Sequence, residues 1–176
     1  EQLLAELRMS KDAAEISAMR HATQIAQNAL RASLPFIRPG RSERQVAAEL
    51  VSQLLRAGSD SLLPFQPIVS GGPNSANPHA VPTDRPLQAG DLLVIDWGAS
   101  HEGYYSDLTR TFVLGQPDEE QARIARLVEQ ANAAGRAAGR PGLRAGDVDA
   151  AARAVIEAGD YGQYFTHRTG HGLGLE

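Results

Sequence analysis

Two aspartates lie close together in the sequence, in segments that are typical of neighbouring strands. Asp96 ends the apolar run LLVID, and Asp107 follows eleven residues later in YYSDLTRTF. A carboxylate at the end of an apolar strand is costly unless it is paired or binds a metal, although a lone aspartate there commonly caps a turn, here near Gly98. Two antiparallel strands would bring the carboxylates side by side, and because like charges repel, a cation between them is a natural explanation.

Three histidines could complete such a site. His171 lies in TGHGLG, whose glycines would let the backbone approach a ligand, and His167 precedes it by four residues. In an extended segment residues i and i+4 share a face, so both imidazoles could line one cleft. His79 lies in the proline-bounded segment NPHAVP, ahead of the Asp96 strand. Each of the three could instead be an ordinary histidine of a surface loop.

The composition limits the chemistry. The 176 residues contain no cysteine, so a metal would have to be bound by carboxylate and imidazole. The net charge of −4 provides no basic surface, and we expect no nucleic-acid partner and no binding to an anionic membrane. No apolar run approaches the roughly 20 residues of a membrane span, and the charged opening residues are unlike a signal peptide. A cytoplasmic location is the expectation.

Four helices are predicted from apolar residues spaced three and four apart. They cover about residues 11–34, from Ser42 to just before Gly58, and about 118–138 and 145–158. The first helix is expected to bury one face, made of Ile16, Met19, Thr23, Ala26, Leu30 and Leu34.

Short strands are predicted between the second and third helices. Residues 62–115 are rich in Gly and Pro and contain the runs FQPIVSG, DLLVIDWGA and LTRTFVLG. Because LLVID does not alternate with polar residues, we expect it to be covered on both faces. A hairpin turn is predicted at Glu102-Gly103. The final stretch YFTHRTGHGLGLE is again expected to have strand and turn character.

The two halves of the chain share a plan. Helix, Arg38-Pro39-Gly40, helix, Ala57-Gly58 recurs as helix, Arg140-Pro141-Gly142, helix, Ala158-Gly159, at an offset of 102 residues for the first pair and 101 for the second. This recurrence suggests an internal duplication, although RPG could occur twice by chance as a helix-breaking tripeptide. We therefore predict an α+β fold of two pseudo-symmetric halves, each made of two helices and an antiparallel sheet. The first half has its strand segment at about residues 65–115, so at the offset of 101 the second set of strands would run from about residue 166 to 216, and the second half is expected to be incomplete.

Taken together, these segments resemble the creatinase/prolidase/methionine aminopeptidase family, the pita-bread metallopeptidases. The matching pieces are NPHAVPTDRPLQAGD, LLVIDWGASHEGYYSDLTRTF and HRTGHGLGLE. The HxxGH arrangement of His167 and His171 is more similar to Xaa-Pro dipeptidases and aminopeptidase P than to methionine aminopeptidases. The opening residues resemble the linker helix after a separate N-terminal domain, which implies the end of a linker over 1–11 and a catalytic domain over 12–176.

The resemblance also implies a site and a function. The family's metal-binding aspartates fall on Asp96 and Asp107, its histidine ligand on His171, and the histidines that line its substrate cleft on His79 and His167. It implies two divalent ions, Mn, Co or Zn, which activate a water. The expected substrate is a small peptide with proline at the second position, and the expected enzyme is a homodimer.

The sequence departs from this pattern at its C-terminal end. Two further glutamate ligands and another histidine of the family lie downstream of the GHG segment, and Glu176 falls on a position that is no ligand there. Both ends of the chain are expected to be interior to a longer protein, and we expect the chain alone to be inactive. A non-catalytic binding protein on this fold and a creatinase-type C–N hydrolase stay open as alternatives.

Overall fold

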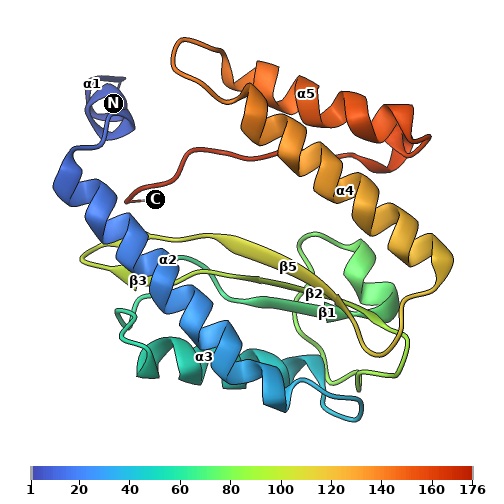
Figure 1. Ribbon diagram of the computed structural model, residues 1–176. Coiled ribbons are helices and arrows are strands. Elements are labelled where there is room, and N and C mark those ends of the chain that lie inside the picture. The colour runs from blue at the N-terminus through green and yellow to red at the C-terminus, as the bar shows by residue number, and fades with distance from the viewer. Residues whose placement is uncertain (1, 176) are drawn as a thin grey trace. The chain divides into compact units, whose positions relative to one another are not determined.

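The structure is a computed structural model that describes residues 2–175; Glu1 and Glu176 lie outside the described residues. It divides into two compact units, Glu1–Gln116 with Leu173–Glu176, and Pro117–Gly172. The first unit contains α1 (Gln2–Met9), α2 (Ala13–Ser33), η1 (Leu34–Phe36), α3 (Glu43–Arg56), β1 (Ile68–Gly71), η2 (Gly72–Ala76), β2 (Leu92–Trp97), β3 (Ser100–His101), β4 (Tyr104–Tyr105) and β5 (Leu108–Val113) (Figure 1). The second contains α4 (Glu119–Ala138), α5 (Ala145–Ala158) and η3 (Gly162–Tyr164).

The four predicted helices are confirmed to within two residues at each end. The starts of the first two are fixed by side chains that bind the first backbone amides. The Asp12 carboxylate accepts from the amide of Glu15 at the start of α2, and the Ser42 hydroxyl accepts from the amide of Gln45 at the start of α3. Gly58 follows α3 with a φ of 99°, a left-handed conformation that glycine adopts without strain.

The buried face of α2 differs in part from the predicted one. Ile16 and Leu34 are 40% and 43% exposed. The face that packs on the core is instead rich in small residues: Ala18, Ala22, Ile25, Ala26, Ala29, Leu30 and Ser33. Small side chains let α2 approach the sheet closely enough for the indole N–H of Trp97 to donate to the carbonyl of Ala26 at 2.9 Å. Of the predicted face, Ala26 and Leu30 are buried as expected, whereas the burial predicted for Ile16 and Leu34 is wrong.

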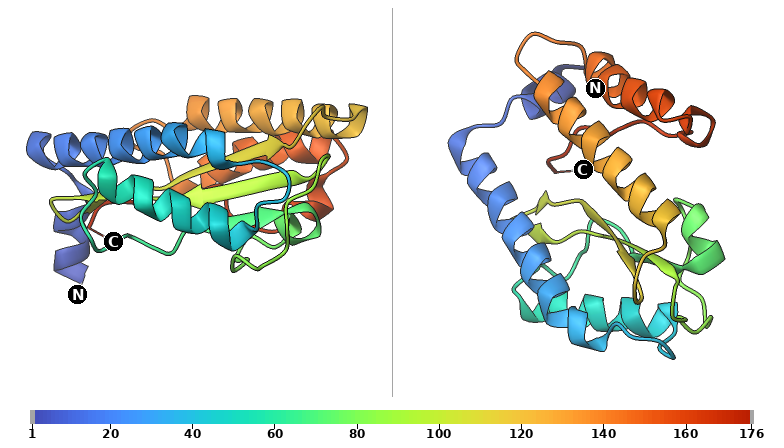
Figure 2. Two further views of the ribbon diagram at one scale, coloured as in Figure 1. Left: turned by 90° about the horizontal axis from the view of Figure 1, so that it is seen from below. Right: turned by 45° about the vertical axis from the view of Figure 1, so that its right-hand side comes forward.

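The three-stranded sheet of the first unit has the order β1-β2-β5 and is antiparallel throughout. Leu93, Ile95 and Trp97 of the central strand are buried in a core shared with α2 and α3, which join at an angle beside the sheet (Figure 2). The intervening residues Val94 and Asp96 are only half-buried. Complete burial of both faces of this strand, as predicted from its apolar run, is therefore not found.

A tight closure joins β2 to β5. The small sheet β3–β4 turns at Glu102 and Gly103, which have φ values of 52° and 79°, so the predicted hairpin turn is confirmed. At the base of this hairpin the amide of Ser106 donates to the carbonyl of Ala99 at 2.9 Å, and the amide of Ala99 donates to the buried hydroxyl of Ser106. A Cβ added to Gly98 would lie 2.1 Å from the carbonyl oxygen of Ser106. Only glycine fits at this crossing.

The loop between β1 and β2 is held by a fully buried carboxylate at the start of α3. Glu43 accepts hydrogen bonds from the amide of Gly71 at 2.8 Å, from the side chain of Asn74 at 3.0 Å, and from the amide and hydroxyl of Thr83 at 2.9 and 2.6 Å. Burial raises the pKa of the Glu43 carboxyl, but these hydrogen bonds together outweigh it and hold the pKa below its ordinary value of 4.5. The loop that carries His79 is therefore anchored at both ends of its irregular stretch.

The second unit is a helical hairpin, in which α4 and α5 lie side by side (Figures 1 and 2). Its core contains Ala131, Ala152 and Ile156. The helices α3 and α5 each have 14 residues, and the glycines Gly40 and Gly142 before them have φ values of 88° and 87°. Equal lengths and equal turns at the same offset support the predicted duplication.

The residues after η3 do not form a strand within the part of the chain that the structure describes. A strand needs a partner for its amides and carbonyls, and much of 165–169 is bound instead to side chains of α5. Further along, the carbonyl of Gly174 accepts from the amide of Tyr105 at 2.8 Å within the first unit. No helix within residues 2–175 is long and apolar enough to cross a membrane.

Replacing Gly98 with alanine is expected to destabilise the first unit. The added methyl meets the backbone of Ser106, which cannot move aside as a flexible side chain would, so we expect the free energy of unfolding to fall by about 2 kcal/mol or more. Gly146→Ala is the matched control, because nothing lies within 4 Å of its added Cβ and alanine favours the helix α5 by about 0.5–1 kcal/mol. Urea unfolding followed by circular dichroism measures both. An equal free energy of unfolding for Gly98→Ala and the parent would show that the backbones of Gly98 and Ser106 do not approach this closely.

Replacing Glu43 with glutamine is expected to lower the free energy of unfolding by about 2 kcal/mol at neutral pH, because the introduced side-chain NH₂ would face donors that need an acceptor. The lowered pKa of Glu43 means that its contribution is present above about pH 4.5 and is lost as the pH falls through the lower folded value. The urea concentration at the midpoint of unfolding, measured between about pH 2 and 7, should therefore change less with pH in Glu43→Gln than in the parent.

Glu49→Gln on the same helix serves as the control for the Glu43 variant. Its carboxylate accepts from Gln53 of the same helix and binds no loop amide in the described contacts, so its acid dependence should match that of the parent. Identical behaviour of the two variants would show that the loop does not depend on the Glu43 carboxylate.

Candidate active site

Asp96 and Asp107 are brought together by the register of β2 and β5. Asp96 pairs with Thr109, and Trp97 pairs with Leu108, which directly follows Asp107. The two aspartates are therefore diagonal neighbours across the ladder, roughly 7–8 Å apart in a regular antiparallel pair. Asp96 is half-buried and Asp107 is exposed. The register thus puts the two carboxylates within reach of each other at one end of the ladder.

Thr109 orients the Asp96 carboxylate. Its hydroxyl donates to Asp96 Oδ1 at 2.8 Å. A hydroxyl that donates to a carboxylate fixes the direction of the oxygen that accepts. The sequence gives little sign of this contact, because LTRTF shows only that Thr109 and Thr111 share a face and the partner strand is set by the register.

His79 lies in the exposed part of the loop between β1 and β2. Its amide donates to the side-chain oxygen of Asn77 at 3.0 Å, an Asx turn that shapes the chain immediately before the imidazole. The next residue, Ala80, is buried, and Thr83 binds Glu43. The residue is thus exposed while the backbone on either side of it is anchored.

His171 is exposed, and its ring is oriented by the backbone of the next residue. Nδ1 lies 2.7 Å from the carbonyl oxygen of Gly172. A carbonyl can only accept, so the proton is assigned to Nδ1 and the neutral imidazole has its lone pair on Nε2. This is the tautomer in which the outer nitrogen of a histidine can bind a metal.

The predicted residues divide between the two units. Asp96, Asp107 and His79 belong to the first unit, and His167 and His171 to the second. Among residues 2–175 no three His, Asp or Glu side chains come close enough together to hold a metal ion. The two aspartates thus lie near each other within the first unit, which also contains His79. His167 and His171 belong to the other unit.

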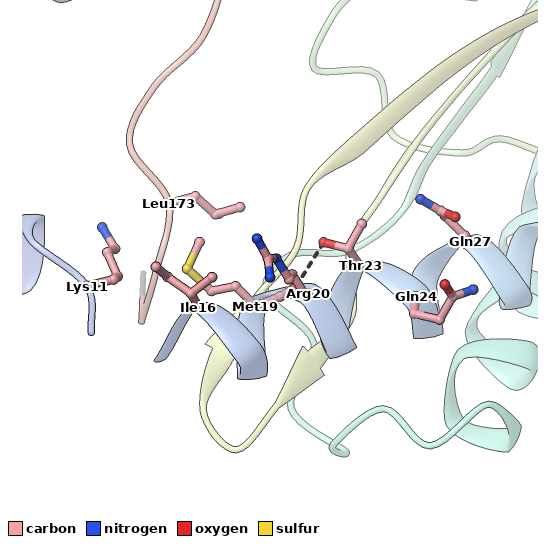
Figure 3. A pocket seen from close by; sticks show the side chains of 8 residues that line it. All are labelled: Lys11, Ile16, Met19, Arg20, Thr23, Gln24, Gln27 and Leu173. Atoms are coloured by element: carbon pink, nitrogen blue, oxygen red, sulfur yellow. Dashed lines mark hydrogen bonds between the residues drawn. The ribbon is translucent and has the colours of Figure 1, made fainter. Parts of the chain in front are cut away.

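A groove of about 740 Å³ runs along the exposed side of α2 (Figure 3). It is lined by Lys11, Ile16, Met19, Arg20, Thr23, Gln24, Gln27 and Leu173. The residues that periodicity placed in the core, Ile16, Met19 and Thr23, line this groove instead. None of the predicted site residues is among its lining, so the groove and the aspartate pair are separate features.

Several contacts of the candidate site were missed by reasoning from the sequence. Glu43, Asp149 and Arg153 each hold a loop that carries a predicted site histidine. Asp149 and Arg153 are four residues apart on a predicted helix, a spacing that indicates no more than a surface ion pair. Glu43 looks like an ordinary acidic residue of a first helical turn.

Comparison with known proteins places these features in a family. The sequence pattern of metallopeptidase family M24 matches residues 17–176. The Xaa-Pro dipeptidase of Pyrococcus furiosus is 40% identical over 174 residues, covering 99% of this chain and 50% of that protein. An uncharacterized peptidase of Bacillus subtilis is 43% identical over 171 residues, covering 97% of this chain and 48% of that protein.

The fold comparison agrees. The solved structure of the prolidase from Pyrococcus furiosus superimposes with a TM-score of 0.96 at 39% identity, covering 99% of this chain and 52% of that one. This likeness confirms the α+β, pita-bread fold that the sequence predicts. The chain spans about half the length of the relatives it matches. It belongs to metallopeptidase family M24.

Proposed function

We propose that this chain is part of a metal-dependent peptidase that hydrolyses the bond before proline in small peptides. The observation that carries the proposal is the register of β2 and β5, which makes Asp96 a diagonal neighbour of Asp107, the residue before β5, in a chain of a metallopeptidase family. The names of the relatives, Xaa-Pro dipeptidase and prolidase, support the substrate class. Because the chain spans about half their length, the activity is proposed for the protein at that length.

The donors fit divalent metal ions. Asp96 of β2 and Asp107, directly before β5, supply carboxylate oxygens, and His171 supplies an imidazole whose Nδ1–H is engaged by Gly172, with no thiolate in the chain. Such a set suits Mn, Co or Zn, and two ions are proposed. The chemistry such ions supply is acidification of water and polarisation of the scissile carbonyl.

The chain's own residues would orient groups and exchange protons. The Thr109 hydroxyl directs the Asp96 carboxylate by its bond to Oδ1. The proposed roles of His79 and His167 are to donate hydrogen bonds from an imidazole N–H to the substrate, and to accept or return a proton at the ring nitrogen as the amide is cleaved. Both lie on exposed segments whose backbone is anchored, which suits side chains that must meet a substrate.

The domain boundary and the assembly complete the proposal. Residues 1–11 are proposed as the end of a linker helix and 12–176 as part of the catalytic domain; the end of α1 at Met9 and the N-cap of α2 at Asp12 support this division. A cytoplasmic homodimer is proposed from the family resemblance.

Removal of metal is expected to abolish activity of the protein at the length of its relatives. Chelation should stop cleavage of an Xaa-Pro dipeptide, and Mn or Co should restore it.

Asp107→Asn should lower kcat/KM by about 100-fold or more and reduce the bound metal, measured by emission spectroscopy. Asp84→Asn removes a carboxylate that pairs with Arg44 on the surface, and should change neither. Cleavage that survives chelation would refute the metal mechanism, and binding of the dipeptide without cleavage would favour a binding protein.

The 176-residue chain alone is expected not to bind two ions tightly. Three proposed donors are too few for two ions. Calorimetric titration with Mn measures the stoichiometry. Tight binding of two ions would show that the chain by itself forms the complete metal centre.

A further inference from the structure

His167 lies on a segment without helix or strand, and this segment is fastened to α5. Residues 166–170 are all exposed. An exposed irregular segment is ordinarily mobile, because it has few contacts to offset the entropy of ordering it. Here, however, the backbone on both sides of His167 is bound by two side chains of a single helix, Asp149 and Arg153.

Arg153 binds the segment from the N-terminal side of His167. One guanidinium nitrogen, Nη1, donates to the carbonyl of Phe165 at 2.7 Å, and the other, Nη2, donates to the carbonyl of His167 at 3.0 Å. The guanidinium also lies 4.5 Å over the centre of the Phe165 ring. Because the guanidinium group is planar and rigid, two carbonyls that accept hydrogen bonds from it are fixed in direction as well as in distance.

Asp149 binds the segment from the C-terminal side. Its Oδ1 accepts from the amide of Thr169 at 2.7 Å and from the hydroxyl of Thr169 at 2.9 Å. Its other oxygen, Oδ2, accepts from Nε of Arg153 at 3.0 Å. The bond from the Thr169 amide, followed by that from Arg153, holds the pKa of the Asp149 carboxyl below its ordinary value.

These contacts differ from those of the exposed ion pair at the start of the same helix. Arg144 and Asp147 approach to 3.6 Å with side chains that are 89% and 41% exposed. The side chains of Arg153 and Asp149 are 31% and 27% exposed, and together they make four hydrogen bonds to the segment besides the one to each other. Stabilising α5 alone would require only the pair.

We propose that Asp149 and Arg153 are positioning residues for His167. The two side chains fix the carbonyl of His167 and the amide two residues beyond it, which sets the direction in which the imidazole leaves the backbone. This inference rests on the proposed function, in which His167 meets the substrate. The pair touches no substrate itself and acts through the segment that it holds.

Hydrogen exchange tests this clamp, the pair Asp149 and Arg153, in the 176-residue chain without any catalysis. In Asp149→Asn and Arg153→Gln, the backbone amides of peptides covering residues 164–170 should exchange about tenfold faster or more. The first variant weakens the acceptor of the Thr169 amide, and the second removes the donor to the carbonyls of Phe165 and His167, so the segment becomes less ordered. Asp147→Asn is the matched control, since it removes one carboxylate from the same helix and should leave this peptide unchanged. Unchanged exchange in both clamp variants would overturn the proposal.

Kinetics test the role in the metal-loaded protein at the length of its relatives. Asp149→Asn and Arg153→Gln should lower kcat about tenfold, with little change in KM and with the metal content of the parent, because a misdirected histidine weakens an interaction made in the transition state. Arg153→Lys keeps the charge and the helix but not the planar fork, and should behave as Arg153→Gln does. It also serves as the test variant if Asp149→Asn fails to fold.

The outcomes separate the two proposals. A parent protein that cleaves no Xaa-Pro peptide with any divalent ion would refute the proposed function, and the exchange measurement would still decide whether the clamp exists. A parent that cleaves, with unchanged kcat in the clamp variants or full activity in Arg153→Lys, would overturn the positioning role alone.

Discussion

The structure of the first unit depends on the closure between β2 and β5. The mutual contacts of Ala99 and Ser106, and the missing side chain at Gly98, let two backbone segments cross at a distance that no other residue allows. This crossing sets the register, because it fixes which residue of β5 lies opposite Asp96. A slip by one residue would turn Thr109 to the other face of the ladder. The aspartate pair, its orienting threonine and the core side chains of β2 all follow from that one constraint.

A second theme is the use of helices to hold irregular segments. Glu43 at the start of α3 holds the loop that carries His79, and Asp149 with Arg153 on α5 holds the segment that carries His167. In both units a carboxylate on the 14-residue helix accepts backbone amides that a strand would otherwise have satisfied. The imidazoles can therefore lie in the open while the chain beneath them stays fixed. This combination is useful wherever a side chain must meet a ligand without being free to turn away from it.

The sequence predicts the helices and the hairpin well because their signals are local. Capping residues such as Asp12 and Ser42 and the turn at Glu102-Gly103 act within four residues, and the structure has them where a helix start or a turn is expected. Features that depend on distant partners are not visible in the sequence. The burial of α2 follows from Trp97, whose hydrogen-bond partner Ala26 is 71 residues away, and periodicity alone predicts the burial of Ala26 and Leu30 but not the exposure of Ile16 and Leu34. The ion pair of Asp149 with Arg153 is readable as helical spacing, whereas its hold on Thr169, 20 residues away, is not.

Trp97 is the only tryptophan of the chain, and its place gives the molecule an internal optical probe. The residue is 1% exposed, directly follows Asp96 in the sequence, and has its indole N–H engaged by α2. Indole emission is sensitive to the polarity around the ring and to nearby charge. The wavelength of that emission therefore registers whether α2 rests on β2, and the intensity registers changes of charge beside Asp96. The residue that locks the helix to the sheet thus makes the state of that junction observable in the unlabelled protein.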